Sequence, residues 1–245
     1  MKNKLIKRIQ SREVRVAVIG LGYVGLPLAV GFAEKGIKVV GLDTDPNKIS
    51  SIVSAEDSIV GIHSERIVNV CTGNTPSLTF TTDYDALKKV DVAIICVPTP
   101  LKDGIVPDLS FVELAAKKIS KRLHDGMLIV LESTTYPGTT EELLLDLFES
   151  GASSNAALKL GKNYFLSFSP ERIDPGRTDY TIENTPKVVG GVTDNCTQIT
   201  ADLYRILVNS VVQVSSPKAA EMVKLLENTY RSVNIGLANE FALIC

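Results

Sequence analysis

Several features that mark specialised classes of protein are scarce or absent in this 245-residue sequence. Neither sign of charge dominates, because 26 Lys and Arg residues stand against 28 Asp and Glu residues. This balance excludes the strongly basic surface typical of proteins that bind nucleic acids or anionic membranes. No segment reaches the roughly 18 to 20 consecutive apolar residues that a membrane-spanning helix needs. We therefore expect neither nucleic acid nor a membrane as a partner.

Cysteine is also scarce, and the four cysteines lie far apart without a C-x-x-C pair. This spacing disfavours a zinc site and a disulfide framework, so we expect reduced thiols and no metal. The first ten residues, MKNKLIKRIQ, are basic and amphipathic but lack the apolar core and cleavage site of a secretory signal. A cytoplasmic location is the resulting expectation.

The apolar content, 44% of residues, is sufficient for a folded core. Short runs rich in Val, Ile and Leu alternate with amphipathic stretches, which is typical of βαβ units with parallel strands covered on both faces. The expected fold is therefore α/β, with a doubly wound, Rossmann-like and mostly parallel sheet. Strands are expected at residues 15–20, 38–43, 77–81, 91–98, 127–133, 163–169, 187–191 and 210–215, and helices near 23–35, 45–54, 64–71, 108–122, 139–150 and 194–207.

The last segment differs from the rest, because helical periodicity runs from Pro217 to the final residue without a turn signal. Proline suits the first turn of a helix, so a long C-terminal helix is expected there. The chain then divides into an N-terminal extension (1–12), a dinucleotide-binding domain (13–215) and the start of the long helix (216–245). A helix that stops without a cap on an apolar run looks interrupted.

The strongest local signal is the pattern G-x-G-x-x-G formed by Gly20, Gly22 and Gly25 between an expected strand and an expected helix. In that context the glycines permit a tight turn, close approach of a pyrophosphate and close packing of the helix on the sheet. Asp43 follows at the end of the second strand, where a carboxylate can bind the adenosine ribose. Its charge would repel a 2′-phosphate, so the expected cofactor is NAD rather than NADP.

Further cofactor contacts are expected beside the glycines and after the fourth and fifth strands, because ligands of open α/β sheets bind at carboxyl ends of strands. Lys48 is interpreted as a solvated helix lysine in preference to a cofactor ligand, and Thr99 and Thr134 as ligands or as caps of the next turn. Beyond the glycines and Asp43, the candidates are Tyr23, Val24, Lys48, Pro98, Thr99, Ser133 and Thr134.

Together with the glycine segment GLGYVGLPLA, the motifs CVPTPL, LESTTYPGTT, FSPERIDPG, KVVGG and SPKAAEMVKLLENTYRSVNIGLANE resemble the UDP-glucose/GDP-mannose dehydrogenase family. The resemblance runs from about residue 12 to the last residue. It implies oxidation of the primary alcohol of a nucleotide-linked sugar to a carboxylate, with two NAD consumed. It also implies two Rossmann-like halves joined by a long central helix that builds a homodimer.

The segment FSPERIDPG is similar to that of UDP-N-acetylglucosamine 6-dehydrogenases of O-antigen and capsule synthesis. A UDP-linked amino sugar is therefore the expected substrate, with the UDP-N-acetylmannosamine and UDP-glucose branches as alternatives. The second glutamate of the UDP-glucose pattern falls at Pro175, so its role cannot be carried over.

The resemblance implies that Thr134 and Glu171 position or activate a water, and that Lys224 and Asn228 stabilise charge on the sugar oxygen. Residues 224 and 228 are neighbours on one helix face, which supports this pairing. The alternative is a solvent-facing stripe that also includes Glu221 and Arg231. Candidate substrate contacts are Arg172, Arg177 and Arg231.

The family's nucleophilic cysteine, in a G-G-x-C-x-P segment, is missing from these residues, and no other cysteine is expected in its place. The chain is therefore expected to be the N-terminal half of a longer enzyme, inactive alone. The alternatives are a non-catalytic NAD-sensing module and a β-hydroxyacid dehydrogenase.

Overall fold

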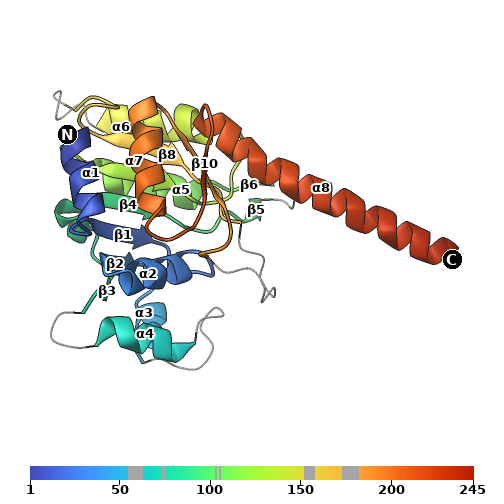
Figure 1. The fold of residues 1–245 in the computed structure, drawn as a ribbon, viewed down its shortest axis with the longest axis horizontal. Coiled ribbons are helices and arrows are strands. Elements are labelled where there is room, and N and C mark those ends of the chain that lie inside the picture. The colour runs from blue at the N-terminus through green and yellow to red at the C-terminus, as the bar shows by residue number, and fades with distance from the viewer. Residues whose placement is uncertain (55–62, 73–75, 103, 105, 152–157, 173–181) are drawn as a thin grey trace.

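An eight-stranded sheet forms the centre of the molecule, as the computed structural model shows (Figure 1). The structure describes residues 1–54, 63–72, 76–102, 104, 106–151, 158–172 and 182–245. The strand order is β10-β9-β8-β7-β4-β1-β2-β3, and all neighbours pair in parallel except β8 and β9. The strands are β1 (Arg15–Ile19), β2 (Lys38–Leu42), β3 (Leu78–Thr81), β4 (Val92–Ile95), β7 (Leu128–Leu131), β8 (Phe165–Phe168), β9 (Lys187–Gly191) and β10 (Val211–Gln213).

This sheet confirms the expected doubly wound fold, and each expected strand region contains one of its strands. The run β3-β2-β1-β4-β7-β8 has the 3-2-1-4-5-6 order of dinucleotide-binding folds. In this order the chain reverses its direction of winding between β1 and β4. A crevice for a ligand is expected at that point, beside the carboxyl ends of the strands.

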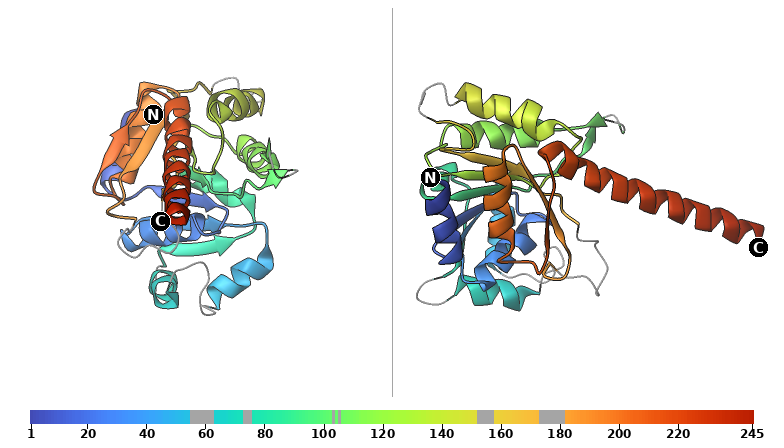
Figure 2. Two further views of the ribbon diagram at one scale, coloured as in Figure 1. Left: turned by 90° about the vertical axis from the view of Figure 1, so that its right-hand side faces the viewer. Right: turned by 45° about the horizontal axis from the view of Figure 1, so that its top comes forward.

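Helices cover both faces of the sheet (Figure 2). In β1, Val16 and Val18 join one buried cluster and Ala17 and Ile19 the other, because side chains alternate along a strand. The α-helices are α1 (Lys2–Gln10), α2 (Gly25–Glu34), α3 (Pro46–Val53), α4 (Ser64–Cys71), α5 (Ser110–Ser120), α6 (Leu145–Gly151), α7 (Asp194–Tyr204) and α8 (Pro217–Ile244). A 3₁₀-helix, η1 (Tyr84–Lys89), and a π-helical segment, η2 (Thr139–Leu144), complete the set.

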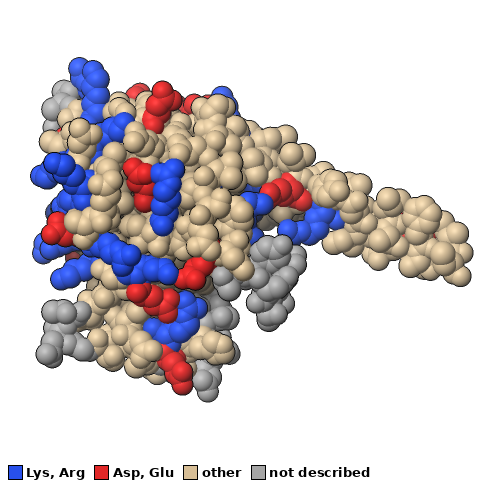
Figure 3. Space-filling view, viewed as in Figure 1, with Lys and Arg blue, Asp and Glu red and all other residues tan. Residues whose placement is uncertain are grey.

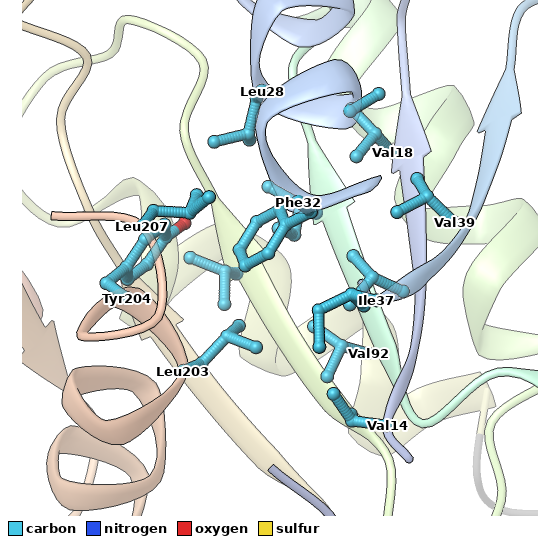
Figure 4. Packing of buried hydrophobic residues seen from close by; sticks show 14 of the residues in the cluster. Val14, Val18, Leu28, Phe32, Ile37, Val39, Val92, Leu203, Tyr204 and Leu207 are labelled. Atoms are coloured by element: carbon cyan, nitrogen blue, oxygen red, sulfur yellow. The ribbon is translucent and has the colours of Figure 1, made fainter. Parts of the chain in front are cut away.

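The core on one face joins distant parts of the chain. Phe32 of α2 and Tyr204 of α7 are fully buried, with ring centroids 6.3 Å apart. Leu203 and Leu207 lie beside them, and the valines of the sheet complete the layer (Figure 4). The second helix of the fold is thereby tied to a helix more than 160 positions later in the sequence.

The C-terminal helix α8 begins against the sheet and then leaves it (Figures 1 and 2). The Ser216 hydroxyl accepts a hydrogen bond from the Ala219 amide, and Pro217 occupies the first turn, as the sequence predicts. From Asn228 onward every residue of α8 is exposed, and charged side chains are sparse on this outer part (Figure 3). A search of the described residues finds no helix with the length and apolarity to cross a membrane.

Besides η1, two further features were not expected from the sequence. Residues 1–12 were interpreted only as an extension, yet they form α1, whose Leu5 and Ile9 are buried against the core next to α7. The four-residue spacing of Leu5 and Ile9, which places both on one face of a helix, could have indicated this packing. The second element is a short antiparallel hairpin of β5 (Leu101–Lys102) and β6 (Val106–Pro107), too short to show a period.

The packing in Figure 4 predicts that Leu203→Ala destabilises the protein strongly. Loss of a fully buried leucine should lower the free energy of unfolding by about 2–5 kcal/mol, measured by urea denaturation. The matched control is Leu114→Ala on α5, because Leu114 is helical but 49% exposed. Its effect should stay within about 0.5 kcal/mol, and equal losses would contradict the packing described.

Candidate active site

The glycine turn between β1 and α2 brings backbone atoms very close together. Gly20 has φ +93°, and a Cβ there would lie 2.7 Å from the Cys96 carbonyl oxygen. A Cβ on Gly25 would lie 1.9 Å from the Gly20 carbonyl oxygen. By contrast, a Cβ on Gly22 would meet nothing within 4 Å. The first and third glycines are therefore required by packing, and the second leaves open the space where a pyrophosphate would lie.

Asp43, which directly follows β2, is hydrogen-bonded to the glycine turn. Its Oδ2 accepts hydrogen bonds from the Leu21 amide at 2.9 Å and from Lys48 Nζ at 2.8 Å, and its Oδ1 accepts one from the Asp45 amide at 3.1 Å. Burial alone would raise the pKa of this carboxyl, but these hydrogen bonds outweigh it and lower the pKa. Asp43 is thus held as an anion where a ribose would bind.

Lys48 is exposed, as the interpretation of a solvated helix lysine expects, but it also has a specific partner. Its ammonium forms an ion pair with Asp43, and its side chain lines the same cavity. Because Asp43 precedes it by five positions across the start of α3, the sequence pattern did not reveal the contact. The pair supplies a cation next to the ribose carboxylate.

A cavity of about 510 Å³ opens above the carboxyl ends of β1, β2, β4 and β7, where the strand order predicts a ligand. The volume is in the range of small-molecule and cofactor sites. All the expected cofactor residues line it except Gly25, which packs beneath the turn: Gly20, Gly22, Tyr23, Val24, Asp43, Lys48, Pro98, Thr99, Ser133 and Thr134. The glycine turn, the anionic Asp43 and this space together fit a dinucleotide.

Three apolar lining residues of the cavity were missed from the sequence. Phe111 and Leu114 lie one turn apart on α5 and are about half exposed, and Tyr84 comes from η1. For Phe111 and Leu114, the sequence could have indicated this role, because large apolar side chains on the solvent side of an amphipathic helix are unusual. They provide a surface against which a flat ring can pack.

Lys224 of α8 reaches the edge of this cavity. Its Nζ donates a hydrogen bond of 2.8 Å to Thr134 Oγ1, and burial lowers the pKa of the ammonium. The alternative of a solvent-facing stripe is therefore wrong for Lys224. It is also wrong for Glu221, whose buried carboxylate accepts hydrogen bonds from the Gly138 and Thr140 amides. Asn228 and Arg231 are exposed on α8.

A buried charged cluster adjoins the cavity and was not expected from the sequence. Lys187 Nζ lies 2.9 Å from Glu132 Oε2 and 3.4 Å from Glu171 Oε2, and Tyr204 donates a hydrogen bond to the other oxygen of Glu132. Burial raises the pKa of Glu132, whereas the two carboxylates hold the pKa of Lys187 above its ordinary value despite its burial. The sequence indicates this cluster only weakly, through single charged residues at the ends of apolar strands, Glu132 after β7 and Lys187 at the start of β9.

Glu171 lies in the loop that follows β8, and the next residue is anchored to α8. Arg172 pairs with Glu227 through two nitrogens, and its Nη1 donates to the Pro186 carbonyl oxygen at 3.0 Å. The guanidinium expected to contact substrate is therefore engaged within the protein. Arg177, another predicted substrate contact, lies outside the described residues.

Among the four cysteines, Cys96 lines the cavity, a location that its place after β4 had not suggested. Burial raises the pKa of its thiol well above the ordinary value, which disfavours the nucleophilic thiolate. Cys196 is buried in α7, Cys71 is partly buried in α4 and Cys245 is exposed at the end of the chain. Within the described part of the chain, no group of His, Cys, Asp and Glu residues could hold a metal ion.

Comparison with known families gives two adjacent matches. Residues 14–208 match the NAD binding domain of the UDP-glucose/GDP-mannose dehydrogenase family, and residues 218–245 match its central domain. The boundary falls at the start of α8.

Individual relatives agree with these matches. Protein CapL of Staphylococcus aureus is 39% identical over 94% of this chain and 52% of its own length. UDP-N-acetyl-D-glucosamine 6-dehydrogenase of Pseudomonas aeruginosa is 37% identical over 95% of this chain and 53% of its own length. The solved UDP-N-acetyl-D-mannosamine dehydrogenase of Pyrococcus horikoshii is 38% identical, with a TM-score of 0.83 over 94% of this chain and 54% of that one. The chain thus spans about half the length of the curated relatives it matches.

The open space at Gly22 predicts that Gly22→Ala weakens NAD binding without unfolding the protein. We expect titration calorimetry to show a loss of affinity of about tenfold or more, or about 1.4 kcal/mol. The unfolding free energy should change by less than about 0.5 kcal/mol. Gly236→Ala, at an open position on α8, is the control and should bind NAD normally. Unchanged affinity in both variants would exclude a cofactor phosphate at Gly22.

The hydrogen bonds to Asp43 predict a pH-dependent contribution to stability. Because the folded-state pKa is lowered, the carboxylate stabilises the fold above its ordinary pKa of 3.8, and this stabilisation is lost as pH falls through the folded-state value. Asp43→Asn should therefore cost about 1 kcal/mol at pH 7 and less in acid. Urea denaturation of both proteins over a series of pH values measures this difference. A difference independent of pH would contradict the assignment.

Proposed function

Because the chain belongs to the UDP-glucose/GDP-mannose dehydrogenase family, we propose that it carries the cofactor and part of the sugar site of an NAD-dependent nucleotide-sugar 6-dehydrogenase. The observation that carries the proposal is the hydrogen bond from Lys224 to Thr134, which joins α8 to the rim of the NAD cavity. A cofactor-sensing module would not need a half-buried ammonium at that place.

The proposed substrate is UDP-N-acetylglucosamine, whose primary alcohol is oxidised to the carboxylate. Support comes from the segment FSPERIDPG and from the Pseudomonas aeruginosa relative named for this sugar. UDP-N-acetylmannosamine is the second candidate, because a relative named for it matches at nearly the same identity. Both are UDP-linked amino sugars, and they differ only in the configuration at one carbon.

The proposed roles follow from the chemistry of each side chain. NAD, when bound, accepts a hydride from the sugar carbon. The Lys224 ammonium, with the Asn228 amide one turn further along α8, stabilises negative charge that develops on the sugar oxygen. Thr134 and Glu171 orient a water, and Arg231, which is exposed on α8, contacts the substrate.

We also propose the division of the chain into residues 1–12, 13–215 and 216–245, with α8 as the axis of a homodimer. Large apolar residues recur on α8 at spacings of three and four, and each of them is more than half exposed: Tyr230, Val233, Leu237, Phe241 and Ile244. Such a stripe is typical of a helix that packs on another surface.

The test is NADH formation by the protein expressed from the whole reading frame that encodes these residues, followed by near-ultraviolet absorbance. We expect oxidation of UDP-N-acetylglucosamine in preference to UDP-N-acetylmannosamine and UDP-glucose. Lys224→Met should lower kcat by about 100-fold or more, as the loss of an oxyanion-stabilising donor does.

The matched control is Lys218→Met, because Lys218 lies one and a half turns earlier on α8 and is paired with Glu142 on the surface. This variant should retain its kcat. Absence of NADH with every UDP-sugar, despite normal NAD binding, would overturn the proposed function. Equal losses of kcat in Lys224→Met and Lys218→Met would exclude the proposed role of Lys224.

A further inference from the structure

The buried cluster around Lys187 lies between two cavities. Glu132 lines the large NAD cavity, whereas Glu171, Lys187 and Tyr204 line a second cavity of about 20 Å³ on its far side. Val24 of the glycine turn borders both. The cluster therefore lies between the cofactor cavity and the second cavity, which Arg172 and Ile182 also line.

Stability alone does not account for this cluster. Lys187, Glu132 and Glu171 are 7%, 1% and 8% exposed, so three ionisable groups have lost most of their contact with water. Burying such groups is costly, and apolar residues of similar size commonly serve stability equally well or better. The cluster also holds two carboxylates against one ammonium, an arrangement that a purely structural ion pair does not require.

The two carboxylates are held differently. Glu132 is fixed on both oxygens, because Lys187 donates to one at 2.9 Å and Tyr204 donates to the other. Lys187 is thereby anchored on the sheet, and its ammonium reaches Glu171 Oε2 at 3.4 Å. Glu132 and Tyr204 thus orient the lysine, and the lysine reaches the carboxylate in the loop.

A second anchor acts on the same loop from α8. Glu171 Oε1 accepts a hydrogen bond of 2.7 Å from the Arg172 amide, and the Arg172 side chain is fixed by Glu227 and by the Pro186 carbonyl oxygen. Lys224 is close enough for its charge to interact with that of Glu171. The Glu171 carboxylate is therefore oriented from the sheet by Lys187 and from α8 through Arg172.

We infer that Lys187 is a positioning residue, which holds the Glu171 carboxylate as an anion in the buried cluster that borders the NAD cavity. The inference rests on the proposed function, because it gives Glu171 the role of orienting water. An anionic carboxylate can accept a proton from water, and a protonated one cannot. Lys187 acts through Glu171 and does not line the NAD cavity.

The charge state of Glu171 depends on the charged groups that face it, several of which lie in the described part of the chain. The two carboxylates keep the pKa of Lys187 above its ordinary value, so the lysine stays charged across the accessible pH range. Lys187 and Lys224 favour the Glu171 anion, whereas Glu132 opposes it. Among the residues that the structure describes, the titratable and charged groups around it include Glu132, Lys187, Tyr204, Lys224, Cys96 and Arg172.

The experiment follows the Glu171 titration by NMR in the 245-residue chain, with glutamate labelled at the side-chain carboxyl carbon and the signal assigned from its loss in Glu171→Gln. We expect Lys187→Met to move this titration to higher pH by about 1 unit or more, since an adjacent positive charge is lost. Lys187→Arg should keep it near the wild-type value. The control Lys89→Met removes an exposed lysine at the other end of the sheet and should leave it unmoved.

An unmoved Glu171 signal in Lys187→Met would overturn the inference, because a purely structural role would lower the melting temperature without shifting the titration. If Lys187→Met does not fold, the double variant Glu132→Gln/Lys187→Met is compared with Glu132→Gln alone, so that only Lys187 differs, and the same criterion applies to that difference. A shifted titration without oxidation of any UDP-sugar would remove the proposed function and leave the Lys187–Glu171 coupling intact. Oxidation of a UDP-sugar together with an unshifted titration would keep the proposed function and exclude the Lys187–Glu171 coupling.

Discussion

The close approach of α2 to the end of β1 is the constraint on which the rest of the site depends. With Gly25 seated against the Gly20 carbonyl oxygen, the N-terminus of α2 lies at the point where the sheet reverses its direction of winding. The amides and dipole of the helix then face the cavity, where a phosphate is favoured. Asp43 fastens the turn through the Leu21 amide, so the ribose and phosphate positions are set by one local structure.

Long-range contacts add the second half of the site. α8 is held against the body by the buried Glu221, which accepts hydrogen bonds from the start of η2, and by Lys224. The same few residues place an ammonium beside the hydroxyl-rich segment after β7 and leave the remainder of the helix exposed. Anchoring at one end thus couples the cofactor domain to the exposed apolar residues of α8.

Local patterns account for most of the fold and for the cofactor residues. The strand runs, the glycine spacing and Asp43 are short-range signals, because they depend on backbone sterics and on the period of side chains along one element. What they did not reveal is the partner of a charged side chain. The ion pair of Lys48 was not expected although Asp43 is only five positions away, because the pattern does not show which way the lysine turns. Glu221 was taken for part of a polar stripe because its partners Gly138 and Thr140 lie 83 and 81 positions earlier in the chain.

The sequence by itself determined a Rossmann-like sheet, a long final helix and NAD as the cofactor. Tertiary structure alone decided that Glu132, Lys187, Glu171 and Tyr204 form one cluster, since β7, β9, α7 and the loop after β8 converge only when the sheet is assembled. The physical reason is that a buried charge is stable only beside its counter-charge. The position of that counter-charge depends on strand order, which no local period of the sequence encodes.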